Sequence, residues 1–90
     1  MQKMANQPKV MIDPRTIEVI NDQLGVILDE AVFDERTEKI FRMRYGIEHP
    51  IETIKVISKE LKMPMKKLNL EIVKIDNKVF NILKKHDLFE

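Results

Sequence analysis

The sequence has no cysteine and no tryptophan, and only two glycines and four prolines among its 90 residues. Without cysteine, neither a disulfide framework nor a thiolate metal site can form. So few glycines and prolines argue against a turn-rich β fold and favour long helices. No apolar run reaches the roughly 18 residues that span a bilayer, and the N-terminus lacks a signal-peptide pattern. We therefore expect one small all-α domain with no membrane segment, in the cytoplasm.

Charge is divided unevenly along the chain, although the net charge is only +1. Residues 1–53 carry seven Lys or Arg and ten Asp or Glu, which gives −3. Residues 54–85 carry nine Lys and three acids, which gives +6, and the last five residues carry two acids, which gives −2. Such a split indicates that one surface meets a polyanion and another does not. The alternative is that the lysines only keep the protein soluble.

The spacing of apolar residues predicts a helical domain over residues 13–85, with a flexible arm over 1–12 and a tail over 86–90. Asp13-Pro14 has the composition of a helix start, with Asp as N-cap and Pro in the first position. One amphipathic helix is expected to follow, and its apolar residues are three or four positions apart: Ile17, Ile20, Leu24, Ile27 and Ala31.

A second helix is predicted to begin after Asp34, an N-cap residue followed by acids in the first turn. It is expected to end at Gly46 after two basic residues, Arg42 and Arg44, whose charge complements the helix dipole without any need for DNA. Its predicted inward-facing side chains are Ile40, Phe41 and Tyr45.

A third helix is predicted from about Ile51 to Lys62, and a fourth begins near Pro64. Apolar residues in the last helix continue at helical spacing: Leu68, Ile72, Ile75, Val79 and Leu83. The stretch from Leu68 to Ile75 also alternates, and Asp76-Asn77 has the composition of a hairpin turn. A winged hairpin is thus the alternative, but we favour a helix, because a strand at Leu68 leaves the element after Pro64 too short to enter a groove.

Two short helices joined by a tight turn, with lysines on the second, have the arrangement of a helix-turn-helix. Residues 34–63 resemble region four of bacterial sigma factors. Arg42-Met43-Arg44-Tyr45-Gly46-Ile47 is similar to that family's Leu-Arg-Tyr-Gly-Leu signature. The next family motif, Thr-Leu-x-x-Ile-Ala-x-x-Leu-Gly-Val, is matched in register by Thr53, Ile54, Ile57, Ser58, Leu61 and Met63. The resemblance covers roughly residues 24–85 and implies a four- to five-helix bundle.

The resemblance also implies a function at promoters: binding double-stranded promoter DNA while docking on the flap of the RNA polymerase β subunit. We expect the contacts with DNA to come from Thr53, Lys66, Lys67, Asn69 and Lys74. This chain departs from the family in two places. Where the family's recognition helix opens with polar residues, the chain has Pro64-Met65-Lys66-Lys67-Leu68-Asn69-Leu70, and Lys62 stands where the family has its turn glycine. Lysines still neutralise phosphates and asparagine still pairs with adenine, but Met65 and Leu70 make no hydrogen bonds.

Polymerase docking is expected through apolar residues of the acidic N-terminal half, namely Leu28, Val32 and Phe33. No region two is present, so a sigma-like subunit of a phage or mobile element, acting in a bacterial or phage-infected cell, fits the sequence. One alternative is a polymerase-binding adaptor that has lost sequence-specific DNA binding. Another is a homodimeric regulator whose seam is the apolar stripe of the last helix.

The C-terminal residues resemble the short peptide with which bacterial proteins dock into the sliding clamp, matching it at Asp87, Leu88 and Phe89. The alternative is that Leu88 and Phe89 pack back onto the bundle. His49 and His86 have no carboxylate at metal-ligand spacing, and no nucleophile or phosphate-binding motif is present. We therefore expect no metal, no cofactor and no enzymatic activity.

Overall fold

A computed structural model describes residues 12–87 of the chain. This part contains five helices and no strand, which confirms the all-α class and the predicted four to five helices. The helices are α1 (Pro14–Asp22), α2 (Leu24–Ala31), α3 (Glu35–Tyr45), α4 (Ile54–Leu61) and α5 (Met65–Lys85).

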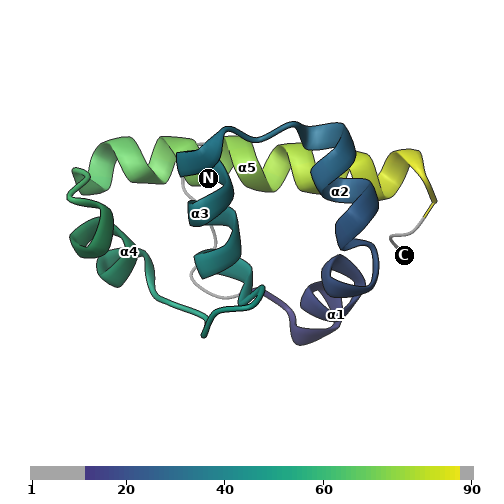
Figure 1. The fold of residues 1–90 in the computed structure, drawn as a ribbon, viewed down its shortest axis with the longest axis horizontal. Helices are drawn as coiled ribbons and strands as arrows, with labels where there is room; N and C mark the ends of the chain where they lie inside the picture. Colours follow the sequence, from purple (N-terminus) through teal and green to yellow (C-terminus); the bar gives the residue numbers. More distant parts are fainter. Residues whose placement is uncertain (1–11, 88–90) are drawn as a thin grey trace, which may run out of the picture.

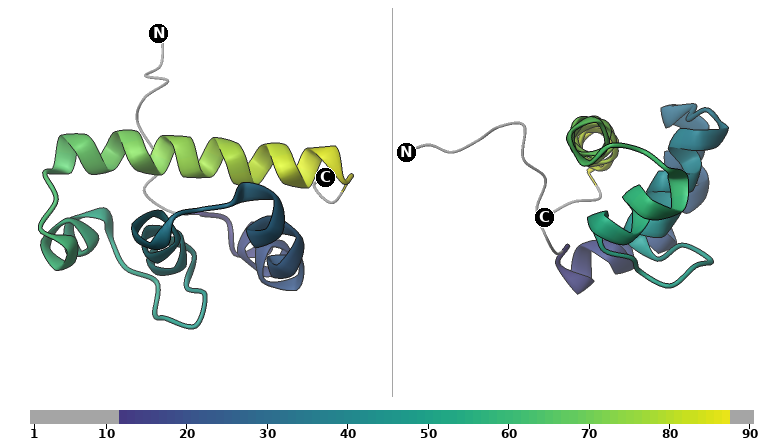
Figure 2. Two further views of the ribbon diagram at one scale, coloured as in Figure 1. Left: turned by 45° about the horizontal axis from the view of Figure 1, so that its top comes forward. Right: turned by 90° about the vertical axis from the view of Figure 1, so that its left-hand side faces the viewer.

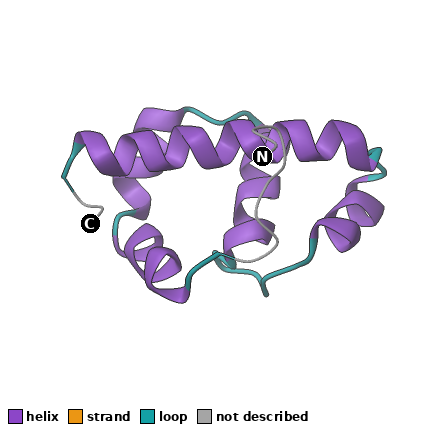
Figure 3. Cartoon of the chain, turned by 180° about the vertical axis from the view of Figure 1, so that it is seen from behind, coloured by secondary structure: helices purple, strands orange, loops and turns teal. Residues whose placement is uncertain are grey.

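Helix α5 is the element on which the others are assembled. Its 21 residues extend roughly 31 Å at the usual helical rise, close to the longest dimension of the molecule, 35 Å. Helices α2, α3 and α4 all pack against it and lie side by side across one of its faces (Figures 1 and 2). The opposite face of α5 is left uncovered by the other helices (Figures 2 and 3).

The core lies between α5 and the row of helices beneath it. Leu68, Ile72, Ile75, Val79 and Leu83 are at most 2% exposed, so the apolar stripe of α5 is used within one chain and is not available as a dimer seam. The same core contains buried residues from the other elements: Ile20, Ile27, Ala31, Ile40, Phe41, Tyr45, Ile47 and Ile57.

The helix predicted to begin at Asp13 is two helices, because the chain bends at Gln23 between α1 and α2. The N-cap prediction is confirmed, since the Asp13 carboxylate accepts a hydrogen bond from the Arg15 amide. Two residues of low helix propensity, Asn21 and Asp22, precede the bend. The bend lets α1 fold under α2 (Figure 1), so the apolar residues form two short faces in place of one straight stripe.

Helix α3 begins and ends as its sequence predicts. The Asp34 side chain accepts a hydrogen bond from the Thr37 amide at 2.7 Å, which lowers the pKa of Asp34. Gly46 ends the helix in the left-handed conformation at φ 69°. Glycine is required there, because a Cβ atom would lie 2.5 Å from the Ile51 side chain.

The connection between α4 and α5 is a turn over residues 62–64. Thr53 caps α4, which therefore begins three residues later than the sequence suggests. Lys62 adopts the left-handed conformation at φ 54°, the geometry for which glycine is the usual residue. The Met63 amide donates to the Ser58 carbonyl at 2.9 Å, and the Ser58 hydroxyl donates to the Met63 carbonyl at 2.5 Å. These two bonds hold the angle between the helices.

Residues 68–83 are helical throughout, so the winged-hairpin alternative is wrong. Asp76, which that alternative placed in a turn, is 8% exposed near the middle of α5. Its carboxylate accepts two hydrogen bonds from the Arg44 guanidinium, at 2.9 and 2.8 Å, and a third from the Tyr45 hydroxyl. The dipole explanation of Arg44 is therefore incomplete, because the side chain joins the end of α3 to α5 through a buried ion pair.

Burial and the charge of Asp76 change the pKa values of its two partners, Arg44 and Tyr45. Burial raises the pKa of Tyr45, and the adjacent Asp76 carboxylate raises it further. Burial alone lowers the pKa of Arg44, but the hydrogen bonds and charge of Asp76 outweigh it, so the net direction is upward. Arg44 thus stays charged and Tyr45 stays protonated at neutral pH.

Candidate nucleic-acid interface

The uncovered face of α5 is strongly basic. Ten residues of α5 are exposed: six lysines, two asparagines and Leu70 on this face, and Met65 on another side of the helix. Neither acid of the helix is among these ten, since Asp76 is buried and Glu71, beside Lys78 around the helix, is half-buried. The six lysines are Lys66, Lys67, Lys74, Lys78, Lys84 and Lys85. A polyanion that approaches this side of α5 therefore meets positive charge and no exposed carboxylate of that helix.

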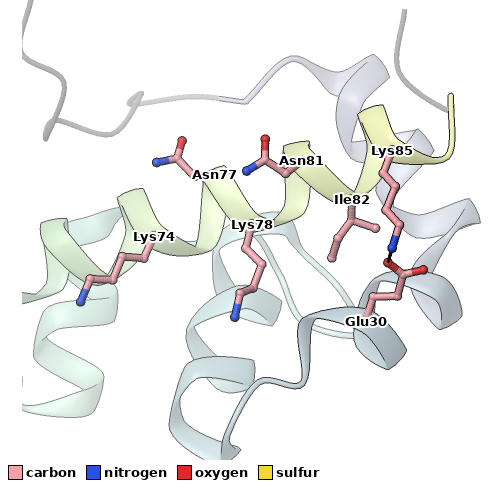
Figure 4. Close-up of a pocket in the computed structure, with 7 residues that line it drawn as sticks. All are labelled: Glu30, Lys74, Asn77, Lys78, Asn81, Ile82 and Lys85. Carbon is pink, nitrogen blue, oxygen red and sulfur yellow. Dashed lines mark hydrogen bonds and ion pairs between the residues drawn. The ribbon is translucent and has the colours of Figure 1, made fainter.

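The two asparagines lie in the middle of this face, and lysines flank them on both sides. At 100° per residue, Asn77 and Asn81 share a strip with Leu70, while Lys74 and Lys78 lie toward α2. Figure 4 shows the Asn77 and Asn81 side chains pointing away from the side on which Lys74 and Lys78 extend. The side with Lys74 and Lys78 borders an open groove of about 490 Å³ between α5 and α2. The groove is lined by Glu30, Lys74, Asn77, Lys78, Asn81, Ile82 and Lys85.

An ion-pair cluster lies at one end of the groove. The Glu30 carboxylate of α2 accepts a hydrogen bond from the Lys85 ammonium at 3.1 Å (Figure 4). Its other oxygen lies 2.5 Å from Nε2 of His86. These bonds, that of His86 above all, lower the pKa of Glu30. Lys78 donates to the Ala31 carbonyl at 3.3 Å. The four remaining lysines of the face make no hydrogen bond or ion pair with any residue in 12–87, so their ammonium groups are available to a ligand.

The residues predicted to contact DNA divide between two positions. Lys66, Lys67 and Lys74 are exposed on the basic face. Asn69 is half-buried and lies about 100° away from Leu70, at the edge of the core. The Thr53 hydroxyl accepts a hydrogen bond from the Val56 amide at 3.2 Å, so it caps α4. The structure therefore brings three of the five onto one surface.

The basic face contains residues that our sequence analysis missed. Asn77, Lys78, Asn81 and Lys84 are all exposed on it. Their spacing from Lys66 and Lys74 follows the helical repeat, and this periodicity would have identified them.

The three residues predicted to dock on polymerase lie at the end of α2 and in the connection to α3. Val32 is 78% exposed and adopts the left-handed conformation at φ 51°, which is rare for a β-branched residue. Leu28 and Phe33 are partly buried against the core. The Phe33 ring lies 5.3 Å from that of Phe41, centroid to centroid. Of the three, only Val32 presents most of its surface to solvent.

Several sequence predictions fall at the chain ends. The proposed arm over residues 1–12 lies outside the described part except for Ile12, which is 9% exposed. Leu88 and Phe89 of the clamp-like tail also lie outside it, and Asp87 is exposed. Within residues 12–87, no three His, Asp or Glu side chains gather as a metal site would require.

No known protein family, curated protein or solved structure matches this chain. Among the helices that the structure describes, none has both the length and the apolar character needed to cross a membrane.

Proposed function

We propose that this protein is a sigma-like transcription factor in which α4 and α5 act as a helix-turn-helix on promoter DNA. The observation that carries the proposal is the exposed face of α5, with six lysines, two asparagines and no acid. A helix with its side chains is about 10–12 Å across, and the major groove of B-DNA is about 12 Å wide. Lysines along such a helix neutralise phosphates, and asparagine amides pair with adenine edges.

A second surface of the proposed factor docks on the flap of the RNA polymerase β subunit. The sequence resemblance to sigma region four supports this partner, and the exposure of Val32 supports the position of the contact. Asp34 and Glu35, both of them exposed, follow Val32 by two and three positions in the sequence. Acidic neighbours repel phosphates, so this surface suits a protein partner better than DNA.

Binding of the full chain to labelled promoter fragments, measured alone and with core polymerase, tests the DNA contact. We expect binding without polymerase, with a dissociation constant of about 10⁻⁴ to 10⁻⁶ M or tighter at physiological salt. Binding of the protein to polymerase without any binding to DNA would instead establish the adaptor alternative. Absence of both interactions would overturn the proposal.

Val32→Gly tests the polymerase contact better than Phe33→Ala, because the Phe33 ring packs against Phe41 at the edge of the core and its loss is expected to disturb the fold. Glycine also accepts the left-handed backbone at position 32, so the variant is expected to fold. We expect Val32→Gly to bind an isolated flap domain at least tenfold more weakly than wild type does, and to bind DNA with unchanged affinity. The matched control is Ile51→Ala, which removes another exposed apolar side chain, 59% exposed, outside the proposed contact. Equal flap binding by wild type and Val32→Gly would exclude this surface.

A further inference from the structure

Leu70 is an apolar residue in the middle of the basic face. It is 45% exposed, and it lies between Lys66 and Lys74, one helical turn away on either side. At 100° per residue both lysines lie within about 40° of it around the helix axis. The buried stripe of α5, including Ile72 and Val79, is on the opposite side. Leu70 therefore makes no contribution to the core comparable to theirs, and a phosphate-binding helix does not require it.

Asn77 lies on the same strip, seven residues further along α5. Seven residues turn the helix by almost two full turns, so the two side chains project in nearly the same direction. The Asn77 amide is exposed and makes no hydrogen bond with any residue in the described part of the chain. Its separation from Leu70 along the axis is roughly 10.5 Å, close to three base-pair steps of about 3.4 Å each.

We propose that Leu70 and Asn77 are the base-reading pair of α5: Leu70 packs on the C5 methyl group of a thymine, and Asn77 hydrogen-bonds an adenine edge about three base pairs away. This inference rests on the proposed DNA-binding function and adds its sequence preference. In the major groove, the thymine methyl is the one apolar group, and the N6 and N7 atoms of adenine match a side-chain amide. The lysines beside this strip hold the phosphates on the flanks of the groove.

The apolar half of the proposal is tested with two duplexes of alternating A and T, identical except that uracil replaces every thymine in one. Uracil lacks only the methyl group, so wild type should bind the uracil duplex about fourfold more weakly, the value for one buried methyl. Leu70→Ala should bind both duplexes equally. The matched control is Met65→Ala, since Met65 is also 45% exposed but lies on another side of α5. This control should keep the fourfold difference.

The polar half is tested by replacing adenine with 7-deazaadenine, which removes the N7 acceptor. We expect wild type to lose about fivefold or more in affinity, and Asn77→Ala to be insensitive to the replacement. Asn69→Ala, at the half-buried asparagine, should remain as sensitive as wild type.

Three results are distinguishable. Methyl discrimination that disappears in Leu70→Ala, together with N7 discrimination that disappears in Asn77→Ala, supports the proposal. Equal wild-type affinity for the thymine and uracil duplexes would overturn the inference while leaving DNA binding intact. Failure of wild type to bind any duplex would overturn both the inference and the proposed function. Circular dichroism of each variant checks that the substitution leaves the fold unchanged.

Discussion

Removal of the buried carboxylate of Asp76 is expected to be among the most damaging single changes in this protein. Asp76→Ala leaves the Arg44 guanidinium without the partner that it contacts at 2.9 and 2.8 Å, and Arg44 is 4% exposed. It also removes the acceptor of the Tyr45 hydroxyl. Breaking one side of a buried ion pair typically costs about 3–5 kcal/mol. A domain of this size has roughly 5–13 kcal/mol of stability in total, so the loss is a large share.

Urea denaturation followed by circular dichroism measures this loss directly. We expect a drop of about 3–5 kcal/mol in the free energy of unfolding and roughly 12–40 °C in Tm. The control Asn77→Ala, at the adjacent exposed position of α5, should change stability by less than about 0.5 kcal/mol. Replacing the whole cluster, as Arg44→Met, Tyr45→Phe and Asp76→Leu together, should recover most of the loss, because no uncompensated charge remains. A loss below about 1 kcal/mol in Asp76→Ala would refute the reasoning.

Three further predictions concern the fold and its pH dependence. Ile57→Ala should destabilise by roughly 2–4 kcal/mol, since Ile57 is fully buried between α4 and α5; an unchanged Tm would contradict the packing described. Burial raises the pKa of Tyr45, so its stabilising contribution is complete below about pH 10 and is lost as pH rises through the higher folded-state pKa. Tyr45 is the only tyrosine, so tyrosinate absorbance reports its ionisation alone. Ionisation near pH 10 in the folded protein would contradict the raised pKa. An identical loss of stability at alkaline pH in Tyr45→Phe would show that Tyr45 is not its cause. Lys62→Gly should raise the free energy of unfolding by up to about 1 kcal/mol, because glycine adopts the left-handed turn without a Cβ penalty; a decrease in urea denaturation would indicate that the Lys62 side chain stabilises the turn.

Local signals in the sequence predicted local structure well. Asp34 and Gly46 mark the two ends of α3 because capping and left-handed termination depend on residues within a few positions of each other. The apolar periodicity after Pro64 correctly identified the face of α5 that enters the core. The bend at Gln23 was not predicted, because the apolar spacing continues across it and only the packing of α1 under α2 requires the chain to turn there.

Contacts between distant positions could not be predicted in the same way. Arg44 and Asp76 are 32 residues apart, and each has a plausible local role, at a helix end or in a turn, that conceals the ion pair. Part of the candidate interface was predictable, since Lys66, Lys67 and Lys74 lie on one exposed face. Asn77 is harder to assign from the sequence, because Asp76-Asn77 also fits a hairpin turn, and only a continuous helix places Asn77 on the same strip as Leu70.

The salt dependence of DNA binding tests the central claim most directly. Each phosphate contact contributes a slope of about −0.9 to the logarithm of affinity against the logarithm of salt concentration. The triple variant Lys66→Ala, Lys67→Ala and Lys74→Ala should therefore flatten the slope by about 2–3 and weaken binding to all sequences alike. Its matched control removes three exposed positive charges from the acidic half of the chain, Arg15, Arg36 and Lys39, and should keep the wild-type slope. Equal slopes for wild type and the α5 triple variant would contradict a role for this face in binding DNA.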